Sequence, residues 1–195
     1  MASIGYYEDP NDKKSWKHKC GGTILNAYIV LTAAHCFYGS SLVDFTFNEK
    51  AQVLLGDSGL NYDADNRHET KYDITIVMGH EKYDGYRPKY DIAVVITSKK
   101  INTNKYINFM PSIRLEDTMT NSDKFYGKDY KTLGWGTSSM ANLFLRETVF
   151  EIYTKNECND TLNNFSDYKR EGINEAFFCA GHRVRYLNFS TDIVD

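Results

Sequence analysis

The sequence lacks any apolar run long enough to cross a lipid bilayer. Its longest apolar stretches, Tyr28 to Leu31 and Ile92 to Ile96, fall far short of the roughly 20 residues that a membrane-spanning helix needs. The chain also lacks an excess of positive charge, since 23 Lys and Arg stand against 26 Asp and Glu and give a net charge of −3. We therefore expect neither a nucleic-acid partner, which favours a basic face, nor a membrane partner, which favours a polybasic patch.

Residues 1–10 lack the basic start and apolar run of a signal peptide, which taken alone indicates the cytosol. Four cysteines argue for an oxidising compartment instead: Cys20, Cys36, Cys158 and Cys179. They are spaced as two pairs that would each close a short loop, and a disulfide over such a loop is worth about 3 kcal/mol. The residues alone leave open three pairings or four buried free thiols. No Cys-x-x-Cys spacing occurs, so we expect no zinc site, and we expect no cofactor.

Most of the chain reads as short strands separated by turn residues. Tyr72, Ile74, Ile76 and Met78 are apolar at every second position, which predicts one face of a half-buried strand. The unbroken apolar run from Ile92 to Ile96 predicts a fully buried strand. Further strands are expected at residues 45–47, 53–55 and 146–153, the last with Thr148, Phe150 and Ile152 on one face.

Helical signals are sparse. Thr154 and Glu157 have the Ser/Thr-x-x-Glu spacing of a capping box, which predicts a short helix that carries Cys158. Residues 102–118 have weak periodicity and fit a link between two halves. Many short strands at regular spacing predict an all-β fold.

Two segments near the N-terminus carry a family signature. Cys20 to Leu25, followed by Leu31 to Cys36, resembles the region around the catalytic histidine of the chymotrypsin/trypsin-like serine proteases. The resemblance implies a Cys20–Cys36 disulfide and makes His35 the general base. We expect the other histidines to be exposed or satisfied in the core: His18, His68, His80 and His182.

A second match lies downstream at Tyr90 to Val95, which is similar to the family's Asp-Ile-Ala segment. The resemblance makes Asp91 the triad carboxylate, which accepts a hydrogen bond from the histidine and stabilises the imidazolium. The alternative is an ordinary aspartate at the start of a strand.

Two further segments follow in the family's order. Thr132 to Thr137 resembles the Gly-Trp-Gly segment of the second barrel, and Ile173 to Gly181 resembles the segment that ends in Cys-Ala-Gly. The resemblance implies a Cys158–Cys179 disulfide and a fold of two antiparallel β-barrels, the second incomplete. We expect a trypsin-like domain over 1–181, with a first barrel over about 1–104, a linker over about 105–128, a partial second barrel over about 129–181 and an unmatched tail over 182–195.

The nucleophilic serine is expected to be absent from this chain. Residues 182–195 do not match the family's Gly-Asp-Ser-Gly-Gly segment, and Ser190 has the wrong neighbours. Ser58 lies in Gly56 to Gly59, which spells most of that motif, but in a loop that the family places away from the cleft. On this interpretation the chain is truncated at both ends. We expect no metal, although four acids stand in a loop that binds calcium in some relatives: Asp57, Asp63, Asp65 and Glu69.

Three interpretations remain. The first is a serine endopeptidase with a Ser-His-Asp triad, inactive as written because the serine segment is missing. The second is a protease-like binding or decoy protein without activity. The third is an unrelated β-barrel, which predicts that Cys20 and Cys36 are not bonded to each other. The family resemblance implies secretion, protein or peptide substrates, protease inhibitors as partners, and a monomer if the chain is soluble.

Overall fold

The computed structural model describes residues 1–12, 15–38, 51–56, 59, 70–85, 89–102, 125–136, 144–162 and 179–181. The chain divides into two compact units, Met1–Asp117 with Leu133–Glu147 and Thr118–Thr132 with Thr148–Asp195. Within the described ranges, no helix combines the length and the apolar character that a membrane span requires.

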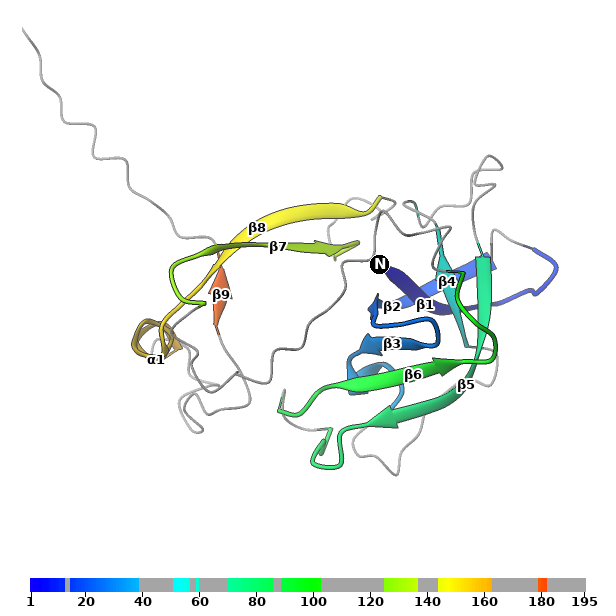
Figure 1. Ribbon diagram of the computed structural model, residues 1–195, viewed down its shortest axis with the longest axis horizontal. Coiled ribbons are helices and arrows are strands. Elements are labelled where there is room, and N and C mark those ends of the chain that lie inside the picture. The colour runs from blue at the N-terminus through cyan, green and yellow to red at the C-terminus, as the bar shows by residue number, and fades with distance from the viewer. Residues whose placement is uncertain are drawn as a thin grey trace, which may run out of the picture. The chain divides into compact units, whose positions relative to one another are not determined.

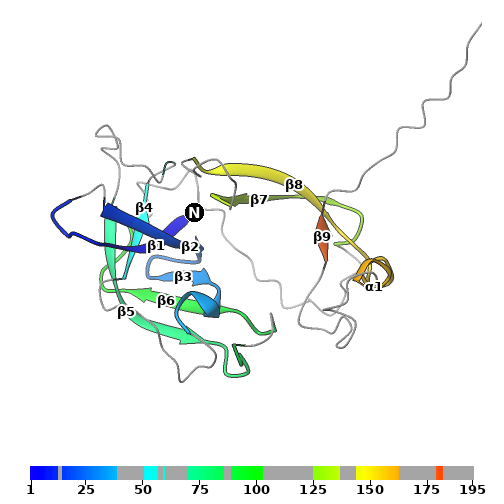
Figure 2. The same cartoon turned by 180° about the vertical axis from the view of Figure 1, so that it is seen from behind.

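Six strands of the first unit close into an antiparallel barrel (Figure 1). They are β1 (Ala2–Tyr7), β2 (Trp16–Ile24), β3 (Ile29–Thr32), β4 (Gln52–Leu55), β5 (Thr70–Gly79) and β6 (Ala93–Thr97). Their order is β1-β2-β3-β6-β5-β4, and β4 pairs back onto β1, as the view from behind also shows (Figure 2). Closure pairs both sides of every strand, so the barrel has no open edge.

Each of the six strands contributes to one core. The buried cluster is Ala2, Ile4, Ile24, Val30, Phe37, Val53, Leu55, Tyr72, Val95 and Ile101. Along β2 the alternation is clear, because Trp16, Gly22 and Ile24 are buried while Lys17, Lys19 and Thr23 are exposed. Alternation of this kind places one side of each strand inside the barrel. The all-β expectation is confirmed.

The prediction that the apolar residues 72, 74, 76 and 78 share one face of a strand is wrong, because β5 contains a β-bulge. Ile74 pairs with Thr97, but Ile76 pairs with Ile96, so Thr75 is an extra residue in the ladder. An inserted residue reverses which side chains point inward. Tyr72 and Ile74 therefore face the core, Val77 replaces the predicted Ile76 there, and both Ile76 and Met78 are 48% exposed.

The strand predicted from the apolar run at 92–96 is present as β6, but it is not buried on both sides. Ala93 and Val95 are buried, whereas Val94 and Ile96 are half-buried and Ile92 is exposed. A barrel strand has only one inward face, and no second layer covers its outer face within the described residues.

A second, smaller sheet has the order β7-β8-β9, from β7 (Asp129–Gly134), β8 (Arg146–Ile152) and β9 (Ala180–Gly181). Glu151 and Ile152 of β8 pair with β9. Of the three β8 side chains predicted to share a buried face, Phe150 and Ile152 are half-buried and Thr148 is exposed. The strand predicted at 45–47 and most of the predicted linker lie outside the described residues.

Helix α1 (Lys155–Leu162) begins at the predicted capping box. The Thr154 amide donates to a Glu157 carboxylate oxygen at 2.9 Å, and the Glu157 amide donates to Thr154 Oγ1 at 3.3 Å. These reciprocal bonds satisfy amides that the first helical turn leaves without partners. The helix carries Cys158, which is buried and bonded to Cys179 just before β9.

A polar network lies inside the first unit. Ser3 is 1% exposed, and its Oγ accepts a hydrogen bond from Trp16 Nε1 at 3.1 Å and lies 2.8 Å from His18 Nδ1. The Ser3 hydroxyl can both accept from Trp16 and share a hydrogen bond with the His18 ring, so it links the two aromatic side chains. The His18 ring also contacts Trp135, with ring centroids 5.0 Å apart. His18 is half-buried, and its ring is hydrogen-bonded.

Replacing Gly22 by alanine is expected to destabilise the barrel by about 1–3 kcal/mol. A Cβ there would lie 2.6 Å from Cγ1 of the fully buried Val30 and 3.1 Å from the carbonyl oxygen of Leu31, which belongs to the β3 backbone. Gly21→Ala is the matched control, because its new methyl would meet only the end of the Met1 side chain. The check is the free energy of unfolding in urea. Equal losses for the two variants would contradict the prediction.

Stability is expected to fall as the pH drops through about 6.5, because burial lowers the pKa of His18 below that ordinary value. Below about 6.5 the unfolded chain takes up a proton that the folded His18 resists, so protonation favours unfolding. His18→Asn keeps an acceptor for Ser3 but does not titrate. Urea unfolding at pH 8 and pH 5.5 should show a smaller loss of stability for this variant than for the unsubstituted chain, and equal losses would refute the argument.

Candidate active site

The segment that carries His35 is a single turn of 3₁₀ helix, Ala34–Cys36, directly after β3. The amides of Phe37 and Tyr38 both donate to the Ala34 carbonyl oxygen at 3.0 Å. The turn is short and its backbone bonds are few, so the direction of the His35 ring depends on what anchors the turn to the barrel.

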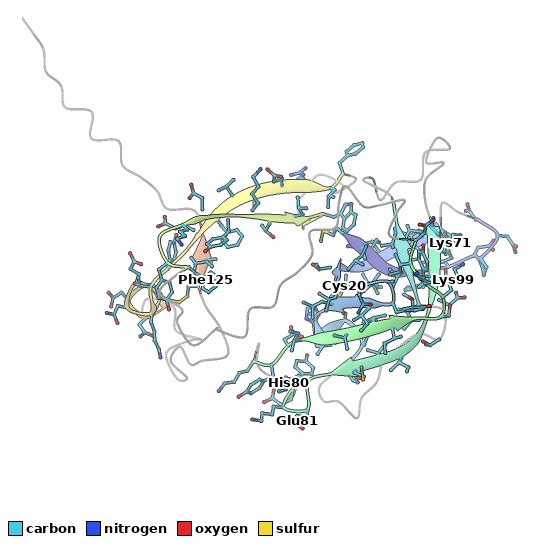
Figure 3. The ribbon with its side chains drawn as sticks, viewed as in Figure 1. Cys20, Lys71, His80, Glu81, Lys99 and Phe125 are labelled. Carbon is cyan, nitrogen blue, oxygen red and sulfur yellow. A yellow bond between two sulfur atoms is a disulfide. The ribbon has the colours of Figure 1, made fainter. Side chains whose placement is uncertain are left out.

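One anchor is covalent. Cys36 is bonded to Cys20 of β2, with 6.2 Å between their Cα atoms, and Cys20 lies within the barrel (Figure 3). A second anchor is Thr32 Oγ1, which donates to the Gly21 carbonyl oxygen at 2.9 Å. Together they tie both ends of the turn to β2. The disulfide is the one that the unrelated-barrel interpretation predicted to be absent, so that interpretation is wrong.

A third anchor is packing. Ala34 is fully buried in a small cluster with Tyr83 and Ala93, and Tyr38 packs against it. A larger side chain at position 34 would have to displace the Tyr83 ring or the β6 backbone. The small residue before His35 therefore lets the turn approach the barrel closely.

Asp91 lies beside this turn because of the register between β3 and β6. Thr32, three residues before His35, pairs with Ala93, two residues after Asp91. Antiparallel pairing at that point brings the end of one strand next to the start of the other. The residues that flank Asp91 form a tight turn, in which the Ile92 amide donates to the Tyr90 carbonyl oxygen at 2.8 Å.

Both carboxylate oxygens of Asp91 bind His35. Oδ1 accepts from the His35 backbone amide at 2.8 Å, and Oδ2 lies 2.6 Å from the ring Nδ1. The side chain of Asp91 is 23% exposed and that of His35 is 60% exposed. Two bonds to one residue fix the carboxylate relative to both the backbone and the ring of His35.

The geometry determines the tautomer of the histidine. An ionised carboxylate only accepts hydrogen bonds, so Nδ1 of His35 carries the proton. In the neutral ring this leaves the lone pair on Nε2, which has no hydrogen-bond partner among the described residues. An oriented imidazole with an accessible Nε2 is suited to take a proton from a nucleophile.

An open hollow of about 440 Å³ lies beside the pair. Asp91 and Ile92 are among the residues that line it, as are Gly21, Gly22 and Ala33, whose side chains are short or absent. Tyr83 is buried close by, and burial, then the negative charges of Asp91 and Asp84, raise its pKa. Its hydroxyl therefore stays protonated over the range in which histidine acts as a base.

No metal centre is supported by the described residues. The one group of close ligand atoms that they contain is Cys20, His35 and Cys36, within 4.8 Å of one another. Because the two sulfurs are bonded to each other, neither is the thiolate that binds a metal. The four loop acids weighed for calcium lie outside the described residues, as do Ser58, Ser190 and the tail from 182.

The structure thus brings together four residues singled out in the sequence, His35, Asp91, Cys20 and Cys36, and places Cys158 and Cys179 in the other unit. Sequence reasoning missed the buried Tyr83, and it included Tyr90 in the matched segment without predicting its φ of 59°. Their spacing follows no strand or helix period, so pattern alone gave no signal for either.

Comparison with known proteins agrees with this geometry. Residues 6–188 match the family described as Trypsin. The chain is 24% identical to the venom serine protease Bi-VSP of Bombus ignitus, over 93% of this chain and 48% of that protein. It is 30% identical to the clotting factor G beta subunit of Tachypleus tridentatus, over 83% and 50%, and 30% identical to trypsin Blo t 3 of Blomia tropicalis, over 84% and 56%. The chain spans about half the length of these relatives, and it belongs to the trypsin family of serine proteases.

Proposed function

We propose that the protein containing this chain is a serine endopeptidase in which His35 is the general base and Asp91 its orienting partner. The observation that carries the proposal is the double hydrogen bond between them, at 2.8 and 2.6 Å. It leaves Nε2 of His35 as the free basic atom on an exposed side chain.

In the proposed reaction, a serine hydroxyl gives its proton to Nε2 of His35 while its oxygen attacks the carbonyl carbon of a peptide bond. The imidazolium that forms is stabilised by the Asp91 carboxylate at Nδ1. It then passes the proton to the departing amine, which leaves an acyl-enzyme, and the same histidine activates the water that hydrolyses the ester. Since Asp91 is already hydrogen-bonded at Nδ1, the histidine needs no reorientation during these steps.

The described residues supply the His–Asp part of this site. Two of their serines are engaged elsewhere, Ser3 with His18 and Ser15 with the carbonyl oxygens of Asp9 and Asp12. The third, Ser98, follows β6 at the opposite end of the strand from Asp91. The hollow of about 440 Å³ opens beside Asp91.

The proposed substrates are proteins or peptides, as the family implies, and the proposed location is extracellular. Both cysteine pairs are disulfide-bonded, which is typical of proteins from oxidising compartments. Two relatives are described as a venom serine protease and a clotting factor subunit, and neither description extends to this chain's own substrate.

The test is peptide hydrolysis by the natural protein that contains this chain, assayed with a fluorogenic peptide library. Asp91→Asn should lower kcat by about 10⁴-fold because the ring loses the acceptor that fixes its tautomer. His35→Ala should lower kcat by about 10⁶-fold. Asp73→Asn is the matched control, since that carboxylate is exposed and accepts from Gln52 instead, and it should keep full activity. Substantial hydrolysis by His35→Ala would overturn the proposal.

A further inference from the structure

Tyr90, the residue directly before Asp91, is stacked on a histidine from the neighbouring strand end. The rings of Tyr90 and His80 have centroids 4.8 Å apart and planes inclined by 18°. Lys82 Nζ lies 5.6 Å from the centroid of the Tyr90 ring. His80 follows the last residue of β5, at the turn that leads away from the barrel (Figure 3), so the stack joins the two ends of the β5–β6 connection.

The backbone of Tyr90 is in an unfavourable conformation. Its φ of 59° is the one positive value that a non-glycine residue adopts in the described part of the chain. A bulky side chain rarely occupies this region, because its Cβ then approaches the neighbouring backbone. Conformations of this kind persist only where the surroundings hold them, and they gather near functional sites.

Backbone hydrogen bonds hold the turn that carries Asp91. The Ile92 amide reaches back to the Tyr90 carbonyl oxygen at 2.8 Å, and the His80 amide donates to the Ile92 carbonyl oxygen at 2.9 Å. These bonds hold the residues on both sides of Asp91, but they do not restrain the side chain of Tyr90. The described contacts of that side chain are the His80 ring and Lys82.

We propose that His80 and Tyr90 are positioning residues, whose stacked rings hold Tyr90 in its unfavourable conformation and thereby keep the Asp91 carboxylate directed at His35. In the structure, neither ring hydrogen-bonds to His35. Their effect on the site passes through the orientation of Asp91. The effect of this positioning on catalysis rests on the proposed function, whereas the orientation of the Asp91 carboxylate does not.

If the stack only stabilised the barrel, removing the stack would leave the His35–Asp91 hydrogen bond unchanged. If the stack positions Asp91, removing the stack would change that bond, and this difference provides the test. The tautomer of His35 can be read from long-range ¹H–¹⁵N spectra of the 195-residue chain labelled with ¹⁵N-histidine, at a pH where the imidazoles are neutral. These spectra use the carbon-bound ring protons, so no exchangeable signal is required. The unsubstituted chain should show His35 protonated at Nδ1, as its bond to Asp91 demands.

Removing the stack should remove that preference. His80→Ala should produce a mixture of the two His35 tautomers, while His80→Phe, which keeps a flat ring on Tyr90, should retain the Nδ1–H form. Tyr90→Gly also removes the stack, but glycine adopts a positive φ without strain, so adding it to His80→Ala should restore the Nδ1–H form. Met78→Ala, at an exposed position on β5, is the control and should leave the tautomer unchanged.

An unaltered Nδ1–H tautomer in His80→Ala would overturn the proposal, as would an equal loss in His80→Phe or a failure of Tyr90→Gly to restore the tautomer in the His80→Ala variant. Each outcome is read from the ring of His35 and not from hydrolysis. A failure of the positioning role is therefore distinguishable from a failure of the proposed protease activity.

Discussion

The register between β3 and β6 is the constraint on which the candidate site depends. Val30 pairs with Val95 and Thr32 with Ala93, and this alignment brings together the segments that carry His35 and Asp91, 56 residues apart in the chain, whose side chains then hydrogen-bond. A slip of either strand by one residue would turn its buried valine outward, so the same alignment serves both the core and the His–Asp pair.

Much of this arrangement was predictable from sequence, because short motifs specify local structure. The capping box at Thr154 and Glu157 predicted the start of α1, and the apolar runs predicted β4 and β6. The motifs could not predict the features of a strand that depend on its pairing with the neighbouring strand. The bulge at Thr75 is defined by the pairing of β5 with β6. The inward direction of Val77 and the exposure of Ile76 and Met78 therefore could not be predicted from the sequence of β5 alone.

The neighbourhood of Asp91 illustrates the same limit at the level of single residues. Asp91 was identified through its resemblance to a family segment, but Tyr83 and Tyr90 were not, since nothing in their spacing marks them. Burial of Tyr83 against Ala34 is a property of three segments meeting. The positive φ of Tyr90 occurs in a turn whose hydrogen bonds involve His80 and Ile92. A residue that acts by orienting its neighbour can be recognised only once the geometry of that neighbour is known.

The Cys20–Cys36 disulfide links the chemistry of the site to the surroundings in which the chain folds. In a reducing compartment, the chain would lose the disulfide's stabilisation of about 3 kcal/mol, while the strands would keep their backbone pairing and the buried cluster its apolar contacts. The turn that carries His35 would lose its one covalent attachment to β2 and keep only Thr32, Ala34 and Asp91 as restraints. The imidazole of His35 would then adopt more orientations on a barrel that is otherwise intact. Reduction would therefore disturb the placement of this general base before it disturbs the fold.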